Sequence, residues 1–277
     1  MGATRHSALH PATHAMHPTH YTLFVPHGAP TFALHPGAIG RAMSEVARRF
    51  EAPRAIVIVS PHWTTSAPTI SAAVELATIH DFYGFDPALY ALRYPARGDA
   101  TAASEVALAL RTAGIDCHVD GTRGLDHGAW IPLREMFPAA QVPIVPLSVQ
   151  AHLGPHHALQ IGRALAPLVQ HGFLIIGSGN VTHNLHDWNA VSLRGAPTPD
   201  YVERFPDWLA ECLQANDLRA LLDYRVASPD GARAHPTEEH LLPLFTALGA
   251  APVGAQAHRY VRATNDHVIS MDGYFFE

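Results

Sequence analysis

The stretch that decides the fold is Phe173-Leu174-Ile175-Ile176-Gly177-Ser178-Gly179-Asn180-Val181-Thr182-His183-Asn184, in which an apolar run leads into a glycine-rich segment and a histidine. A short apolar, β-branched run bounded by glycine predicts a buried strand over residues 173–178. The glycines and asparagine after it predict a tight turn, which would aim His183 and offer backbone N–H groups to a site. Ligands bind at the carboxyl ends of strands in open α/β sheets, so a site is expected where this strand ends.

Two further histidines follow apolar runs in the same way. Residues 22–25 lead through a proline to His27, and residues 55–60 lead through a proline to His62. Neutral imidazole is the commonest metal ligand in proteins, so histidines that converge from several strand ends predict a mononuclear metal site. Each also has a structural interpretation, as a turn residue at His27 and as a buried histidine that donates to a carbonyl at His62.

Two more histidines stand next to expected helix starts. His235 precedes a proline, which biases it towards an extended conformation. Glu238 and Glu239, which follow, are interpreted as charges in the first turn of a helix rather than as ligands. His127 follows Asp126, which is suited to cap the next helix, while the histidine would point into a cleft. The joint occurrence of these histidines at the ends of elements is a stronger signal than any one of them.

The composition is that of a globular protein. The chain has 277 residues, of which 48% are hydrophobic and 15% charged, with a formal net charge of −6. It has no basic run, so nucleic acid is not an expected partner. No apolar stretch approaches the about 20 residues of a membrane span and no signal peptide is recognised, so a cytoplasmic protein without a membrane partner is expected. The two cysteines, Cys117 and Cys212, are far apart and predict neither a disulfide framework nor a thiolate metal motif.

Strand-like and helical patterns alternate along the chain. Strands are predicted at 22–26, 55–60, 115–119, 142–149, 173–178, 255–263 and 267–276, and helices at 37–50, 101–113, 128–136, 156–170, 200–223 and 237–248. This alternation predicts an α/β fold with a central, mostly parallel or mixed sheet and helices on both faces. The last two strands, separated by Asn265-Asp266, predict a C-terminal β-hairpin.

The first twenty residues are predicted to be separate from this domain. They contain His6, His10, His14, His17 and His20 among Ala, Thr, Pro and Met. A His-rich tract of this kind can bind metal loosely, but its composition favours a disordered tail. The expected organisation is therefore a tail over residues 1–20 and one domain over residues 21–277.

Common nucleotide and hydrolase motifs are missing from the sequence. Gly177-Ser178-Gly179 lacks the third glycine of the dinucleotide fingerprint, and no phosphate-binding GKS or GKT occurs. Gly-x-Ser-x-Gly is also absent, which argues against a serine hydrolase.

Six stretches together resemble the class III extradiol ring-cleavage dioxygenases of the catalytic-subunit-B type, and among them the bacterial 4,5-DOPA dioxygenase branch. They are His27–Phe32, Ser60–Trp63, Asp81–Phe85, Gly124–Trp130, Gly177–Leu185 and His235–His240. The resemblance runs from about Tyr21 to Glu277 and preserves the order of the motifs.

The resemblance implies a dioxygenase that inserts O2 into a small catecholic substrate, DOPA-like or related, at a mononuclear non-haem metal. The implied ion is Fe(2+), with Zn(2+) in some members as isolated. Carried over by position, the metal ligands are His27, His62 and His235, and the catalytic residues are His183 and His127, with His183 also a candidate fourth ligand. This set departs from the protocatechuate 4,5-dioxygenases, which use two histidines and a glutamate.

The substrate pocket is expected to be aromatic, and oligomer formation is compatible with the sequence. The residues expected to line the pocket are Phe82, Tyr83, Trp130 and Asn180, with Phe85 and Tyr274 as further aromatic candidates. For the segment that holds Phe82 and Tyr83, core packing is an equally good interpretation.

Two other functions use the same histidines. A zinc-dependent hydrolase would employ them to lower the pKa of a bound water, and would turn over with zinc without consuming oxygen. A non-catalytic metal-binding or signalling protein of the same fold would consume no oxygen with any catechol. The presence of His183 and His127, which a scaffold does not require, argues against the latter.

Overall fold

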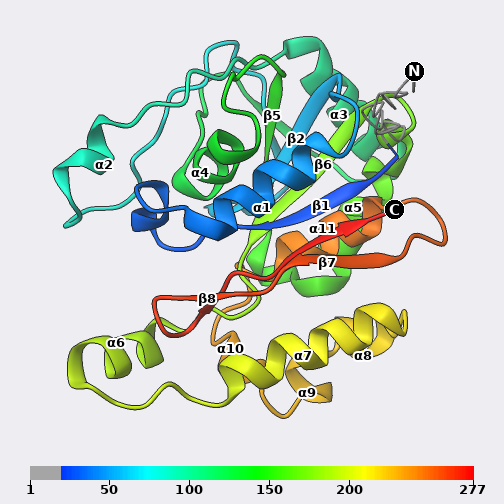
Figure 1. The fold of residues 1–277 in the computed structure, drawn as a ribbon. Helices are drawn as coiled ribbons and strands as arrows, with labels where there is room; N and C mark the ends of the chain where they lie inside the picture. The colour runs from blue at the N-terminus through cyan, green and yellow to red at the C-terminus, as the bar shows by residue number, and fades with distance from the viewer. Residues whose placement is uncertain (1–19) are drawn as a thin grey trace, which may run out of the picture.

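A computed structural model of the chain describes residues 20–277 (Figure 1). Its strands are β1 (Thr22–Pro26), β2 (Ala55–Thr64), β3 (Thr69–Ser71), β4 (His118–Asp120), β5 (Ile144–Val149), β6 (Phe173–Gly179), β7 (Ala257–Val261), β8 (Thr264–Asn265), β9 (Ile269–Ser270) and β10 (Gly273–Phe276). Its α-helices are α1 (Gly37–Arg48), α2 (Pro87–Ala91), α3 (Ala100–Thr112), α4 (His127–Met136), α5 (Gly154–Val169), α6 (Leu185–Arg194), α7 (Tyr201–Gln214), α8 (Leu218–Leu222), α9 (Tyr224–Ala227), α10 (Gly231–Ala234) and α11 (Leu242–Ala250). Two short 3-10 helices, η1 (Pro30–Ala33) and η2 (Ala151–Leu153), complete the set.

One mixed sheet of eight strands forms the centre, in the order β4-β3-β5-β2-β6-β1-β10-β7. The inner strands β5, β2, β6 and β1 run parallel to one another. Strand β10 is antiparallel to both β1 and β7, and β3 is antiparallel to β5. The carboxyl ends of β1, β6 and β2 therefore lie side by side at one edge of the sheet.

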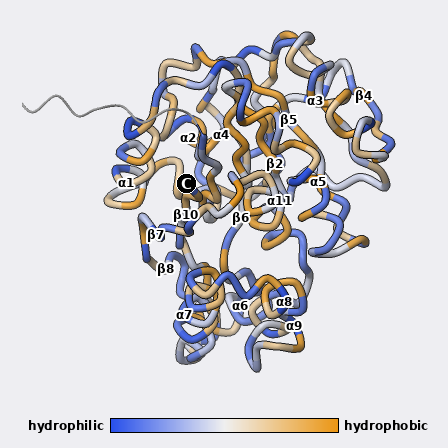
Figure 2. The backbone as a smooth tube through the Cα atoms, turned by 90° about the vertical axis from the view of Figure 1, so that its right-hand side faces the viewer, coloured by the Kyte–Doolittle hydropathy of each residue, from blue (hydrophilic) through white to orange (hydrophobic). Residues whose placement is uncertain are grey.

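Helices cover both faces of this sheet. Helices α1 and α4 pack on one face and α5 and α11 on the other, as the side view in Figure 2 shows with the central strands between them. The inner strands are buried along their length because both faces are covered; β1, β5 and β6 have no exposed residue. Helices α6 to α10 form a separate group below the sheet in Figure 1, where α7 contacts β7 and β9.

The predicted fold class is confirmed, as are the five predicted strands that built it and the C-terminal antiparallel pair, which is β7 with β10. Several local predictions were wrong. The helix predicted from residue 237 begins at Leu242, and the helix predicted over 200–223 is divided into α7 and α8. Asn265-Asp266 lies not between β7 and β10 directly but at the tip of the small β8–β9 ribbon that joins them. Strand β3 and helix α6 were missed.

The predicted tail falls, apart from His20, on residues outside the described part of the chain. Within residues 20–277 no helix is long and apolar enough to cross a membrane.

Candidate metal centre and catalytic pocket

Three histidines from different elements meet at the carboxyl edge of the sheet. His27 directly follows β1, His62 lies near the end of β2, and His240 lies two residues before α11. One ligand atom of each lies within 4.8 Å of the others, and the Nε2 atoms of His27 and His62 are 3.3 Å apart. Strands β1 and β2 both flank β6 in parallel, so their carboxyl ends are held close together.

The hydrogen bonds around His27 fix which ring nitrogen is free. The Ser178 hydroxyl donates to the carbonyl of Gly128, so its oxygen is left to accept the Nδ1–H of His27 at 3.0 Å. The remaining nitrogen, Nε2, then carries an unshared electron pair and faces His62. Such an outer hydrogen bond orients a ligating histidine and fixes its tautomer.

His240 is brought to the site by a close approach between its backbone and β6. The backbone N–H of Asn180 donates to the His240 carbonyl at 3.0 Å. A Cβ on Gly179 would lie 2.2 Å from that same oxygen, and one on Gly177 would lie 2.0 Å from the carbonyl oxygen of Pro243. The two glycines are thus part of the strand, not of the predicted tight turn, and they are needed for packing. At the ring, Nδ1 of His240 lies 3.0 Å from Oε1 of Glu239, so the carboxylate accepts a hydrogen bond from Nδ1–H and Nε2 keeps its lone pair.

The three imidazoles fit a metal ion. Burial, together with the neighbouring histidine charges, lowers the pKa of His62 to about 3 and the pKa values of His27 and His240 well below their usual range. All three are therefore neutral near pH 7 and offer lone pairs. Two nitrogens bound to one tetrahedral ion at 2.0–2.1 Å lie about 3.3–3.4 Å apart, which matches the spacing of the His27 and His62 nitrogens.

The structure does not bring His235, the sequence-based choice for the third ligand, into this group. Its ring is fully buried against Phe205 and Tyr224, and its Nε2–H donates to the carbonyl of Val181 at 2.7 Å. No ring nitrogen of His235 belongs to a group of ligand atoms within 4.8 Å of one another, and its Nδ1 has no hydrogen-bond partner among residues 20–277. His240, five residues later, takes the position beside the other two histidines.

The two predicted catalytic histidines lie beside different members of this cluster. His183 stacks on His240 with ring centroids 3.4 Å apart and an interplanar angle of 8°, and burial lowers the pKa of His183 to about 4. His127 lies beside His62, with ring centroids 3.9 Å apart. As expected, His127 begins α4 and Asp126 caps that helix by accepting from the N–H of Ala129.

Sequence reasoning missed the role of Asp81. Its Oδ2 accepts the Nδ1–H of His127 at 2.8 Å and its Oδ1 accepts the backbone N–H of the same residue at 2.8 Å. Its Oδ2 also lies 3.6 Å from Nδ1 of His62. Burial raises the pKa of Asp81, but the hydrogen bonds and charge of His127 outweigh it and lower this pKa to about 2, so the carboxylate is ionised. The sequence feature that could have indicated this contact is the Asp81–Phe85 motif, which was interpreted for its aromatic residues alone.

The histidines open into a cavity of about 570 Å³. Its polar lining comes from the five histidines and from the side chains Thr31, Asn189, Glu239 and Asp266, and its apolar walls include Phe82, Phe85, Leu185, Trp188 and Ile269. A volume of this order is typical of a small-molecule site. No arginine or lysine is among its lining residues within the described chain.

Of the residues expected in the pocket, Phe82 and Phe85 line this cavity and four others do not. Tyr83 is 91% exposed. Trp130 is fully buried and donates from its indole to the carbonyl of Ile79. Asn180 is buried beside Ser270 and Met271, and Tyr274 is buried in β10.

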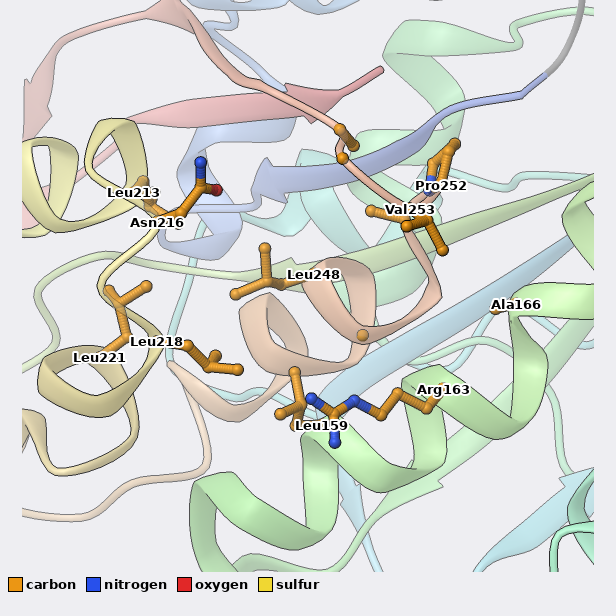
Figure 3. Close-up of a pocket in the computed structure, with 14 residues that line it drawn as sticks. Leu159, Arg163, Ala166, Leu213, Asn216, Leu218, Leu221, Leu248, Pro252 and Val253 are labelled. Carbon is orange, nitrogen blue, oxygen red and sulfur yellow. The ribbon is translucent and has the colours of Figure 1, made fainter.

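A second cavity, of about 470 Å³, lies between α5, α11 and the α7–α8 segment (Figure 3). Leucine, alanine, proline and valine dominate its walls, and Arg163 is the charged residue there. It has neither histidine nor carboxylate in its lining, so it offers no ligand set for a metal ion.

Comparison with known proteins agrees with this geometry. The family model described as "Catalytic LigB subunit of aromatic ring-opening dioxygenase" matches residues 21–274. A 4,5-DOPA dioxygenase extradiol of Beta vulgaris is 35% identical over 259 residues, covering 92% of this chain and 96% of that protein. The protein of the same name from Escherichia coli K12 is 34% identical over 236 residues, covering 82% and 84%. A crystal structure of an Escherichia coli K12 protein has a TM-score of 0.76 at 28% identity, covering 93% of this chain and 99% of that one. The chain belongs to the class III extradiol ring-cleavage dioxygenases.

Proposed function

We propose that this protein cleaves the ring of a catechol at a single metal ion held by His27, His62 and His240, with Fe(II) as the working ion and the catalytic domain spanning residues 21–277. The observation that carries this proposal is the convergence of three neutral imidazoles at the floor of a cavity with apolar walls. His240 replaces His235 in the ligand set, because His240 and not His235 places a ring nitrogen within 4.8 Å of the ligand atoms of His27 and His62.

His27, His62 and His240 would hold the ferrous ion, which would supply adjacent positions for catecholate and O2 and the redox chemistry between them. The residues around it handle protons and exclude water. His183 and His127 flank the ligand cluster, where an imidazole can accept or return a proton of the substrate hydroxyls. Phe82 and Trp188 supply apolar wall against which a flat ring can pack.

The charge of the cavity favours certain catechols. Glu239 and Asp266 both line it, and Oδ2 of Asp266 is buried without a hydrogen-bond partner among the described residues. With no arginine or lysine among the lining residues of the described chain, a catechol whose only charge is a carboxylate would meet repulsion, whereas an ammonium group would find a partner. This supports a DOPA-like or amine-bearing catechol, together with O2, as the substrates.

The test is anaerobic reconstitution of the metal-free protein with Fe(II), followed by addition of a catechol in oxygenated buffer. We expect oxygen uptake and a yellow ring-opened product in equal amounts, both lost in His27→Ala. His118→Ala, on the exposed edge strand β4, is the control and should retain both. Turnover with Zn(II) and no oxygen uptake would support the hydrolase alternative, since zinc has no redox chemistry. No oxygen uptake with any catechol would refute the proposed reaction.

A further inference from the structure

Asp81 makes a two-point contact with the start of α4. It lies in the segment between β3 and α2, and its two carboxylate oxygens accept separately from the backbone N–H and from the ring Nδ1–H of His127, both at 2.8 Å. The His127 side chain is 8% exposed and that of Asp81 is 21% exposed. Because the backbone bond anchors the carboxylate, the second oxygen is held against one particular nitrogen of the ring.

We propose that Asp81 is a positioning residue that fixes His127 in the tautomer with its proton on Nδ1, so that Nε2 is the basic nitrogen presented to the catalytic cavity. The assignment of a base rests on the proposed ring cleavage, whereas the tautomer does not. An ionised carboxylate is an acceptor only, so the ring nitrogen that it contacts must carry hydrogen. Nδ1 is engaged, and His127 lines the cavity, so Nε2 is the nitrogen available there.

The proton step that follows is simple. Nε2 of His127 takes the proton of a catechol hydroxyl, and the electron pair of that O–H bond stays on the catechol oxygen. The ring becomes an imidazolium with hydrogen on both nitrogens, and its positive charge is offset by the Asp81 carboxylate at 2.8 Å. A carboxylate that holds a histidine tautomer and stabilises the imidazolium is the arrangement by which the aspartate of serine-protease triads acts.

His183 lacks this support. Its ring stacks on His240, and among residues 20–277 no carboxylate is hydrogen-bonded to the His183 ring. Of the two catalytic candidates named from the sequence, His127 is therefore the one equipped to hold a positive charge during turnover. His183 lies close to His240 and Glu239 instead, where it can contact the proposed metal ion.

Asp81→Asn is the decisive variant because it preserves shape while it removes the negative charge and replaces an acceptor facing Nδ1 with a donor. With its carbonyl at the backbone N–H of His127, the asparagine turns its NH2 group towards Nδ1, which must then become an acceptor. The proton moves to Nε2, and the basic nitrogen is lost from the cavity. The matched control is Asp86→Asn, five residues further along the same segment, where the side chain caps α2 and asparagine caps equally well.

Two measurements test the proposal. The first is the 15N chemical shifts of the His127 ring in the metal-free protein, assigned by comparison with His127→Gln; we expect the Nδ1–H tautomer in the parent and in Asp86→Asn, and the Nε2–H tautomer in Asp81→Asn. The second is turnover per bound iron. Loss of a general base typically lowers kcat by about 10²–10⁴-fold, so Asp81→Asn should fall in this range with KM changed less than about threefold, and Asp81→Glu should recover part of the rate.

The double variant Asp81→Asn/His127→Gln should be no slower than His127→Gln alone, because both changes remove the same function. If Asp81→Asn folds poorly, Asp81→Ala can replace it in the cycle, because it too removes the carboxylate. An Nε2–H tautomer in the parent would overturn the proposal, as would a loss of less than about threefold per bound iron in Asp81→Asn. A parent that cleaves no catechol would refute the proposed function, and the nitrogen shifts would still decide the tautomer.

Discussion

Replacing His240 and His235 separately by alanine should give opposite phenotypes, although the two residues are only five positions apart. His240→Ala removes a nitrogen from the cluster formed with His27 and His62. Losing an outer-shell partner of a metal ligand already costs about 10–100-fold in metal affinity, so losing a direct ligand should cost more than about 100-fold. The fold should survive, because His240 holds β6 through its backbone carbonyl, which alanine keeps.

His235→Ala should instead retain the metal and lose stability. Its ring fills space against Phe205 and Tyr224, and its departure leaves the Val181 carbonyl without its 2.7 Å hydrogen bond. An unsatisfied buried acceptor costs about 1–3 kcal/mol. Together with the cavity left by the ring, the loss should total about 2–4 kcal/mol of the free energy of unfolding.

The assay has two arms. Metal content after desalting, with affinity from chelator competition, measures the first effect; urea unfolding of the metal-free proteins measures the second. The control is His118→Ala on β4, which should change neither. A stable His235→Ala protein that has lost its metal, or a His240→Ala protein that keeps a full equivalent, would refute this assignment of ligands.

Three further outcomes follow from the same contacts. Ser178→Ala removes the acceptor of the His27 Nδ1–H, and chelator competition should report a metal affinity lower by about 10–100-fold; an unchanged affinity would mean that the serine is dispensable for orienting the ring. Asp266→Asn should lower kcat/KM for 3,4-dihydroxyphenethylamine about tenfold, equivalent to about 1.4 kcal/mol, and leave 4-methylcatechol unaffected, because only the former carries an ammonium group; equal losses on both would contradict a charge contact. The metal-free protein should lose stability as the pH falls below about 6.5, since His235 and His183 have pKa values lowered by burial to about 3 and about 4, so that the unfolded chain binds more protons than the folded one. The loss should reach about 1.4 kcal/mol per pH unit for each such histidine until the folded-state pKa is reached, and a flat profile from pH 7 to 5 in urea unfolding would rule it out.

The sequence predicted the sheet well because its inner strands are buried on both faces. Apolar runs such as 55–60 and 173–178 have few alternatives to a central strand, and parallel order puts their ends at one edge. That is why His27 and His62 could be predicted to converge. Strand β3 has three residues and no such run, and it takes part in the sheet only through pairing with β4 and β5.

The choice between His235 and His240 could not be made from local pattern. Both lie in an irregular segment between α10 and α11, where no periodicity indicates which side chain faces which way. The proline after His235 indicates its backbone conformation but not its neighbours. Contacts distant in sequence distinguish the two residues. Phe205 and Tyr224 surround the ring of His235, whereas the backbone hydrogen bond from Asn180 holds His240 at the cluster.

The Gly177-Ser178-Gly179 segment joins these observations to the chemistry. The sequence predicted a tight turn here, but the segment is the last part of β6. Each of its three residues contributes to the histidine cluster. The two glycines leave room for the carbonyls of His240 and Pro243 at distances that a Cβ would block. Between them, the Ser178 hydroxyl accepts a hydrogen bond from Nδ1–H of His27 and donates one to the carbonyl of Gly128. One short strand end thus fixes the approach of one imidazole and the tautomer of another, so its composition is explained by the histidine cluster rather than by a turn.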